Sequence, residues 1–390
     1  GLYRYYVLGL LTVVYVLNFL DRQILAILLQ PIKEDLGLSD TQLGFLTGIA
    51  FALFYTCFAI PMARWADRGV RRSIVALALG CWSLMTAASG LAFNYASLLA
   101  ARIGVAVGES GGGPSSQSLI ADYFPRHERS RAMAIYYLGL PIGILIGFLA
   151  GGWINEFFGW RTAFLVVGLP GVAVALLVRF TLREPERGMA DGLQAESASP
   201  PLGETVKHLW RCRSYRHLNF GSALHAFVGY GIASWLPSFL IRSHGMTTGE
   251  VGTWLALITG GAGALGTMVG GIWAERLARR DERWYLWLPA LATLASIPFV
   301  TVTYLSPDPI VALLVYIPPA FLGFFWSGPV HAVAQTVVPL RMRAMAAAGM
   351  LFVINLIGLG LGPQLVGVIS DLLRPDFGVH SLRWALLAVS

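Results

Sequence analysis

The chain has 390 residues, of which 56% are hydrophobic and 13% charged, and its mean hydropathy is +0.65. A soluble domain usually carries about 25% charged residues, so these values exclude an ordinary soluble protein and predict a polytopic membrane protein. The net charge of +7 does not indicate nucleic-acid binding, because the basic residues are scattered through short loops. The three cysteines lack metal-ligand spacing, so we expect free thiols and no metal site.

Twelve apolar runs in the sequence can form membrane-spanning helices, each of which needs about 20 predominantly apolar residues. The first six occupy 4–30, 42–63, 73–94, 96–120, 132–155 and 161–180, and the next five occupy 216–241, 250–273, 284–305, 310–338 and 344–371. A twelfth begins near Arg383, and we expect the chain to end inside it. The pattern predicts an all-α membrane protein with two six-helix bundles and a truncated last helix.

A polar stretch between the two sets of runs sets the expected domain boundaries. Residues 181–213 contain prolines, serines and several charges, a composition typical of a linker. We expect an N-terminal six-helix bundle over 1–180 and a C-terminal bundle over 214–390. The linker over 181–213 is expected to include a short surface helix near 202–213.

A charged octapeptide occurs once in each predicted bundle. Residues 65–72 read W-A-D-R-G-V-R-R, and residues 273–280 read W-A-E-R-L-A-R-R. Each copy lies between two apolar runs, so the duplication indicates two similar membrane halves, an architecture typical of transporters. We expect ion pairs at a cytoplasmic gate, with charges that only orient the helices as the alternative. The candidate gate residues are Asp67, Arg68, Arg71, Arg72, Glu275 and Arg276.

Alternate loops hold most of the Lys and Arg residues, including both copies of the octapeptide. Cytoplasmic loops of membrane proteins carry an excess of these residues. We therefore expect both termini and the central linker to be cytoplasmic.

Four charged residues fall well inside predicted spans: Asp21 and Arg22 in the first, Arg102 and Glu109 in the fourth. At about 1.5 Å per residue, Asp21, Arg22 and Glu109 share one layer near the middle of the membrane, and Arg102 lies closer to the surface. Charges at such depth are costly, so each is a candidate functional residue. Two carboxylates around one arginine predict a proton relay, with Asp21 and Glu109 as proton-coupling groups.

Arg22 is expected to have two roles, as counter-ion to an acid and as anchor for an anionic substrate group. The alternative is that Arg22 only pairs with one of the acids and holds two helices together. For Arg102, a structural role and a role in gating are both open.

The second half has no comparable buried acid. Its seventh and tenth spans offer neutral candidates for substrate binding: Tyr230, Trp235, Trp326 and His331, with His225 nearby in the sequence. We place them, with Phe19 and Arg22 of the first span, in a predicted substrate-binding set. Packing inside the helix bundle is the alternative for each aromatic side chain.

The octapeptide resembles the signature G-x-L-A-D-R-x-G-R-R that follows the second helix of major facilitator transporters. The run Arg102-x5-Gly108-Glu109 is similar to a fourth-helix motif of the same superfamily. In addition, N-F-L-D-R over 18–22, L-G-F-L-T over 43–47 and V-G-E-S over 107–110 resemble the Spinster family. This resemblance implies a twelve-helix major facilitator fold and proton-linked transport of amphipathic lipids such as lysophospholipids or sphingoid phosphates. It also implies that Asp21, Arg22 and Glu109 are the coupling residues.

The predicted function is secondary transport by alternating access, with protons as the coupling ion and no cofactor. An uncoupled or multidrug-type transporter of a small organic solute is the alternative. We expect no enzyme, because the spans contain no H-E-x-x-H and the chain contains no G-x4-G-K-[ST] loop. The short loops and the lack of N-x-S/T acceptor sequences suit a monomeric protein of the bacterial cell membrane.

Overall fold

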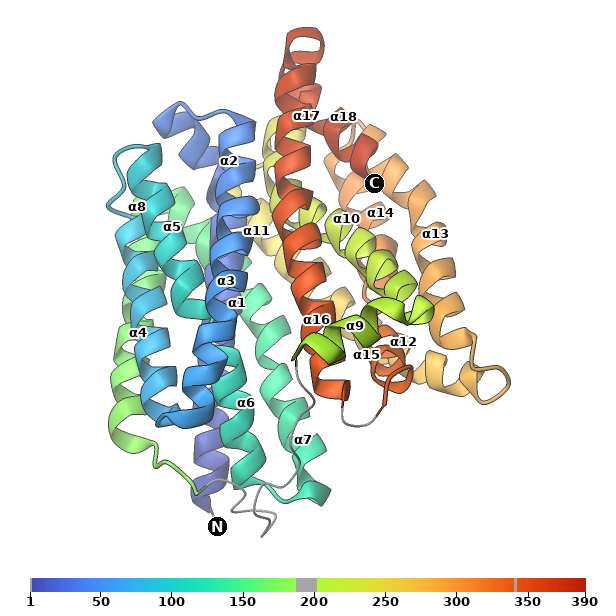
Figure 1. Ribbon diagram of the computed structural model, residues 1–390. Coiled ribbons are helices and arrows are strands. Elements are labelled where there is room, and N and C mark those ends of the chain that lie inside the picture. The colour runs from blue at the N-terminus through green and yellow to red at the C-terminus, as the bar shows by residue number, and fades with distance from the viewer. Residues whose placement is uncertain (1, 187–201, 340–341) are drawn as a thin grey trace. The chain divides into compact units, whose positions relative to one another are not determined.

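The computed structural model describes residues 2–186, 202–339 and 342–390 (Figure 1). Helices make up nearly all of these ranges, which contain no strand. The first half of the chain contains α1 (Leu2–Leu36), α2 (Asp40–Thr47), α3 (Ile49–Arg68), α4 (Arg71–Ser89), α5 (Tyr95–Glu109), α6 (Gly112–Tyr123), α7 (Arg126–Tyr137) and α8 (Gly139–Thr181).

The second half begins with a short helix and continues with longer ones. Its α-helices are α9 (Leu202–Arg211), α10 (Arg213–His244), α11 (Thr248–Leu255), α12 (Gly263–Ala278), α13 (Trp284–Leu305), α14 (Pro309–Leu322), α15 (Ser327–Thr336), α16 (Arg343–Val353), α17 (Gly362–Phe377) and α18 (Ser381–Val389). Two π-helical segments, η1 (Ala256–Ala262) and η3 (Ile354–Leu361), continue α11 and α16, and a short 3-10 turn, η4 (Gly378–His380), precedes α18. The surface helix expected near 202–213 is present as α9.

Nine helical stretches within the described ranges are long and apolar enough to cross a membrane. These stretches account for eleven of the twelve predicted spans, because two of them, Arg131–Thr181 and Met345–Val389, each contain two spans. The first of these turns back at Gly159, whose φ of 83° is left-handed and suits glycine. The fourth predicted span is divided between α5 and α6, which are each too short to be counted.

The chain forms two compact units. Unit 1 consists of Gly1–Leu38, Ala50–Glu196 and Thr247–Thr253, and unit 2 consists of Ser39–Ile49, Ser197–Met246 and Trp254–Ser390. Each unit therefore includes a short segment from the other half of the sequence. The boundaries predicted at 180 and 213 did not anticipate this exchange.

In unit 1, α8 packs along both α1 and α4, and α4 also packs on α5 (Figure 1). Glycines allow the close approach of α8 to α1: a Cβ on Gly143 would lie 2.6 Å from the carbonyl oxygen of Val16, and one on Gly147 would lie 3.0 Å from that of Leu20. The contact fixes α1 at the turn that carries Asp21. Small residues at membrane helix contacts commonly have this effect.

In unit 2, α10 packs against η3 and α17, and α13 packs against α12 and α14. The predicted span over 310–338 is broken into α14 and α15 by a turn that contains Gly323 and Trp326. At the two π-helical segments and at this break, the regular α-helical pattern of backbone hydrogen bonds is interrupted. Such departures are frequent at functional sites.

Two short segments belong to the unit formed mainly by the other half of the chain, Ser39–Ile49 in unit 2 and Thr247–Thr253 in unit 1. Each of these exchanged segments contains the start of a helix, and a carboxylate accepts hydrogen bonds from that start. In unit 2, Asp371 accepts hydrogen bonds from the backbone N–H groups of Asp40 (3.1 Å) and Thr41 (2.7 Å) at the start of α2. In unit 1, Glu156 accepts one from the N–H of Gly249 (2.7 Å) at the start of α11. Free N–H groups at a helix start favour such anionic partners.

Candidate functional site

Arg22 of α1 and Glu109 of α5 form a buried ion pair in unit 1. The Nε and Nη2 atoms of Arg22 each lie 2.8 Å from Oε2 of Glu109. The Glu109 side chain has no exposed surface, whereas 19% of the Arg22 side chain is exposed. The depth estimate placed these two residues in one layer, and they are in direct contact.

Asp21 lies beside this pair but has a different hydrogen-bond partner. Its carboxylate accepts a hydrogen bond of 2.8 Å from the hydroxyl of Thr86 on α4. Asp21 is 3% exposed and interacts electrostatically with Glu109 and Arg102. Two carboxyl groups therefore lie in one buried site, as the sequence predicted.

Arg102 is as deeply buried as the acids, with 3% of its surface exposed. The smaller membrane depth expected for Arg102 is a separate quantity from burial and stays a prediction. Its guanidinium lies 5.6 Å from the ring centroid of Phe51 and interacts electrostatically with Glu109 and Asp21. Neither Nε nor Nη1 of Arg102 has a hydrogen-bond partner within the part of the chain that the structure describes, and the same holds for Oε1 of Glu109.

Aromatic rings surround the exposed part of Arg22. The guanidinium carbon lies 5.5 Å from the ring centroid of Phe19, 5.2 Å from that of Phe51 and 5.3 Å from that of Tyr55. Such contacts stabilise a cation through the ring faces. Phe19, which the sequence placed in the predicted substrate-binding set, is therefore next to Arg22.

Unit 2 contains a cluster of neutral and aromatic side chains around Trp326. Its ring centroid lies 5.0 Å from that of His225 and 5.9 Å from that of His331. His225 contacts the carbonyl oxygen of Gly323 (3.0 Å) and the hydroxyl of Thr293 (3.2 Å) through its two ring nitrogens. The turn between α14 and α15 thus brings Trp326 beside both histidines.

Two other predicted binding residues in unit 2 lie in different surroundings. Tyr230 is partly buried and packs against the same apolar core as Trp326. Trp235 is fully buried, and its indole N–H donates to the carbonyl oxygen of Pro363 at 2.8 Å. Trp235 therefore has no exposed surface in this conformation, and its role in substrate binding stays a prediction.

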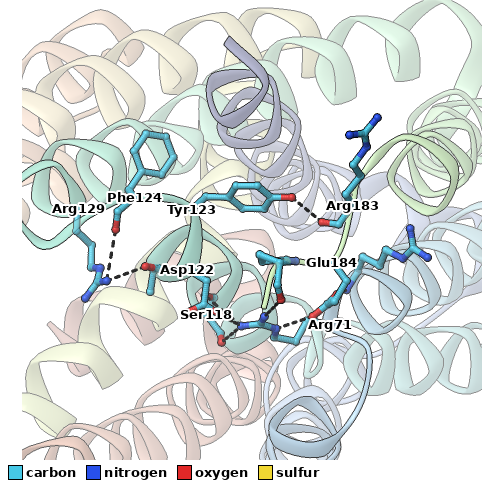
Figure 2. Close-up of polar contacts among 11 residues, drawn as sticks. Arg71, Ser118, Asp122, Tyr123, Phe124, Arg129, Arg183 and Glu184 are labelled. Atoms are coloured by element: carbon cyan, nitrogen blue, oxygen red, sulfur yellow. Dashed lines mark hydrogen bonds and ion pairs between the residues drawn. The ribbon is translucent and has the colours of Figure 1, made fainter. Parts of the chain in front are cut away.

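The first octapeptide copy forms a dense polar network inside unit 1, built around Arg71 (Figure 2). Arg71 pairs with Asp122 and with Glu184, the latter at 2.8 Å between Nε and Oε1. It also donates to the hydroxyl of Ser118 at 2.9 Å and to the carbonyl oxygen of Pro185 at 3.0 Å. Arg71 is 1% exposed. It is the first residue of α4 and connects this helix to the end of α6 and to the segment that follows α8.

The other gate candidates are less tightly held. Arg72 donates to the carbonyl oxygen of Leu182 at 3.0 Å, Arg68 is exposed, and the side chain of Asp67 lies outside the described part of the chain. In the second copy, Arg276 is exposed, and Glu275 forms an exposed ion pair of 3.1 Å with Arg279.

Tyr123 adds a second contact near this network. Its hydroxyl donates to the carbonyl oxygen of Arg183 at 2.6 Å (Figure 2). Burial, with a further contribution from Tyr3, raises the pKa of the Tyr123 phenol above its usual value. The hydroxyl therefore keeps its proton and continues to donate this hydrogen bond at any physiological pH.

Asp40 and Arg242 form a buried ion pair in unit 2 that the sequence did not predict. Two hydrogen bonds of 2.7 Å join the guanidinium to the carboxylate, and the hydroxyl of Ser370 donates to the same carboxylate at 2.7 Å. Asp40 falls between the predicted spans 4–30 and 42–63. The equal spacing of Gly152-x3-Glu156 and Gly367-x3-Asp371 was a usable signal for the carboxylates at both exchanged helix starts.

The glycines of this repeated pattern have the same function in both units. A Cβ on Gly152 would lie 2.4 Å from the carbonyl oxygen of Thr248, and one on Gly367 would lie 2.3 Å from that of Asp40. Glycine therefore lets each helix start approach closely, and the acid four residues later accepts hydrogen bonds from its backbone, one for Glu156 and two for Asp371. No group of three or more potential metal ligands occurs in the described residues.

Comparison with known proteins shows which family this chain resembles. A model of the Major Facilitator Superfamily matches residues 11–363. An "MFS-type efflux pump" of Mycolicibacterium smegmatis is 35% identical over 97% of this chain and 87% of its own length. Rat "Protein spinster homolog 1" is 30% identical (92% of this chain, 71% of its own), and the zebrafish "Sphingosine-1-phosphate transporter SPNS2" is 26% identical (98% and 79%).

A solved structure agrees with these sequence relatives. The crystal structure of a bacterial homologue of the human lysosomal transporter Spinster, inward-facing and unoccupied, superimposes with a TM-score of 0.89 at 32% identity. The match covers 99% of this chain and 94% of that one.

Proposed function

Because the chain belongs to the Major Facilitator Superfamily and to its Spinster family, we propose that this multi-pass membrane transporter couples substrate movement to protons. The proposed substrate is an amphipathic, lipid-like molecule with an anionic group, moved by alternating access. The observation that carries the proposal is the buried cluster of Asp21, Arg22, Arg102 and Glu109. Members of this superfamily are transporters and not enzymes, as the sequence predicted.

The proton-binding groups in this proposal are Asp21 and Glu109. Two carboxyl groups that interact strongly take up protons as a pair, and the apparent proton affinities belong to the pair. Glu109 has one oxygen, Oε1, without a hydrogen-bond partner in the described residues. A proton bound there would meet no competing donor.

The exchange of partners at Arg22 would link protons to substrate. A proton on Glu109 removes the charge that holds Arg22 and leaves a guanidinium with 19% of its side chain exposed. Arginine binds carboxylate and phosphate groups through two parallel hydrogen bonds. An anionic substrate group can then take the place of the Glu109 carboxylate.

Two observations support the substrate class. The rings of Phe19, Phe51 and Tyr55 next to Arg22 provide apolar surface beside a cation, which suits an amphipathic molecule. In addition, a relative of this chain is named a sphingosine-1-phosphate transporter. The Trp326 cluster, with His225, Tyr230 and His331, is our proposed binding surface in unit 2.

We further propose a monomer in the bacterial cell membrane, with cytoplasmic termini, protons as the coupling ion and no cofactor. The Arg71 network and the second octapeptide copy are the proposed parts of a cytoplasmic gate. The alternative function is export of another small organic solute, which the name of the mycobacterial efflux pump favours.

The test measures proton uptake and substrate flux together in liposomes that contain the purified protein. A screen of lysophospholipids, sphingoid phosphates, drugs and sugars at two pH values first identifies the substrate. The Asp21→Asn and Glu109→Gln proteins should then lose proton uptake that accompanies flux. Glu34→Gln is the matched control, because Glu34 lies on α1, as Asp21 does, and is exposed.

Coupling that persists in both buried-acid variants would exclude these residues as the proton site. Binding of drugs but not of lipids would favour the efflux alternative. Proton coupling and substrate class are therefore decided by separate measurements.

A further inference from the structure

Helix α9 is joined directly to a helix that can span the membrane. Only Cys212 separates its last residue, Arg211, from Arg213, the first residue of α10. α10 is one of the stretches that are long and apolar enough to span the membrane. A helix joined so closely to the end of a span stays within a short distance of the lipid headgroups.

The faces of α9 differ in burial. Leu209 is 6% exposed and packs in an apolar cluster with Tyr215, Val338, Met342 and Ala346. Val206 and Trp210 are 54% and 65% exposed and, four residues apart, lie on one side of the helix. The apolar stripe of α9 is therefore covered by protein along one edge only.

Basic residues accompany this exposed apolar edge. Lys207, Arg211 and Arg213 are exposed, and the guanidinium of Arg216 lies 5.9 Å from the ring centroid of Trp210. None of the ion pairs found between described residues involves these three exposed cations. The exposed part of α9 and the start of α10 therefore combine apolar and positively charged side chains.

We propose that α9 is an interfacial anchor that binds anionic phospholipids of the adjacent leaflet. Val206 and Trp210 lie at the boundary of headgroups and acyl chains, where tryptophan is enriched. Lys207, Arg211 and Arg213 contact lipid phosphates. An amphipathic helix with aromatic and basic residues has the composition of such membrane-surface helices.

The occupant is a lipid surface and not a soluble protein, for two reasons. The exposed edge is continuous with a membrane span, and its charge complements anionic headgroups. Each basic residue near such a surface contributes roughly fivefold to affinity, so removal of three should weaken binding on the order of 100-fold.

The experiment uses the full-length protein in neutral detergent and titrates it with a fluorescent phosphatidylglycerol. A variant with Lys207→Gln, Arg211→Gln and Arg213→Gln should bind this lipid about 100-fold more weakly. The charge-preserving variant with Arg211→Lys and Arg213→Lys should bind it as the unaltered protein does. Phosphatidylcholine with the same fluorophore should bind weakly to all three proteins.

A second variant, Val206→Gln with Trp210→Gln, tests the apolar edge and should also weaken binding while keeping every charge. Equal affinity of the neutralised and unaltered proteins for phosphatidylglycerol would overturn the proposal. So would a change of oligomeric state in the Val206→Gln, Trp210→Gln variant with unchanged lipid affinity, because a second copy would then cover this face. Circular dichroism of each variant establishes that the helices remain folded.

Discussion

The Arg22–Glu109 pair of unit 1 and the Asp40–Arg242 pair of unit 2 are both buried, but they differ in how completely their polar atoms are satisfied. Asp40 in unit 2 receives two hydrogen bonds from Arg242 and one from Ser370, all of 2.7 Å. In unit 1, the two nitrogens of Arg22 that bond to Glu109 converge on one oxygen, Oε2. The other oxygen of Glu109 lacks a partner in the described residues, as do two nitrogens of Arg102.

This difference indicates that the Asp40–Arg242 pair stabilises the fold, whereas the cluster around Glu109 is arranged for binding protons or ligands. A buried polar atom without a partner lowers stability by about 1–3 kcal/mol, so a site selected for stability alone would not retain several of them. Such groups are instead common where protons or ligands bind. We infer that the Asp40–Arg242 pair holds α2 in unit 2, whereas the Arg22–Glu109 pair changes partners during transport.

The largest expected effect comes from breaking the satisfied pair. Asp40→Asn removes the carboxylate charge that accepts two hydrogen bonds from the buried Arg242 guanidinium, so the free energy of unfolding should fall by about 3–5 kcal/mol. Denaturant unfolding in detergent, followed by circular dichroism, measures the loss. The control is Asp35→Asn, because the Asp35–Arg161 pair is about half exposed and should contribute only about 0.2–1 kcal/mol.

Equal losses in these two variants would contradict the distinction between a buried and an exposed pair.

Glu109→Gln should have a smaller effect on stability and a larger effect on coupling. The amide keeps the shape of the side chain and removes a charge that interacts with Asp21, and Arg22 is partly exposed. We expect a loss of about 1 kcal/mol in the free energy of unfolding. The response of flux to a pH gradient should fall at least tenfold, on the order of 1.4 kcal/mol.

The comparison fails if Glu109→Gln destabilises the protein as strongly as Asp40→Asn does. It also fails if the Glu109→Gln protein keeps its pH response.

Substitution of the aromatic cluster in unit 2 should change substrate affinity and leave proton coupling intact. Trp326→Phe removes the indole N–H and part of the surface beside His225 and His331. Its loss should weaken binding by about 0.5–1.5 kcal/mol, measured as an increase in KM. A changed number of protons per substrate would show that the two functions are not divided between the units.

The smallest effect is expected at the second octapeptide copy. Glu275 and Arg279 are 65% and 75% exposed, and an exposed pair on one helix contributes about 0.3–0.5 kcal/mol. Glu275→Gln should therefore lower stability by no more than this amount, and high salt should abolish the difference. A reduction of flux without loss of stability would instead support the proposed gate.

The sequence by itself determined the fold class, the number of spans and the charges inside the first and fourth spans. These features follow from composition and hydropathy, because a charge in a long apolar run stands out against its neighbours. The depth count also placed Arg22 and Glu109 together, since helical rise converts residue number into distance. The short surface helix expected near 202–213, inside the polar linker, is present as α9.

Only the tertiary structure decided which polar atoms are satisfied. Asp40 and Arg242 lie 202 residues apart, and nothing in the local sequence of either predicts the other. The exchange of helix starts between units depends on the approach of Gly152 and Gly367 to backbone carbonyls, which sequence spacing alone does not specify. Hydrogen bonds act over a few ångströms and depend on direction, so a pattern of residues identifies the candidates and packing determines their partners.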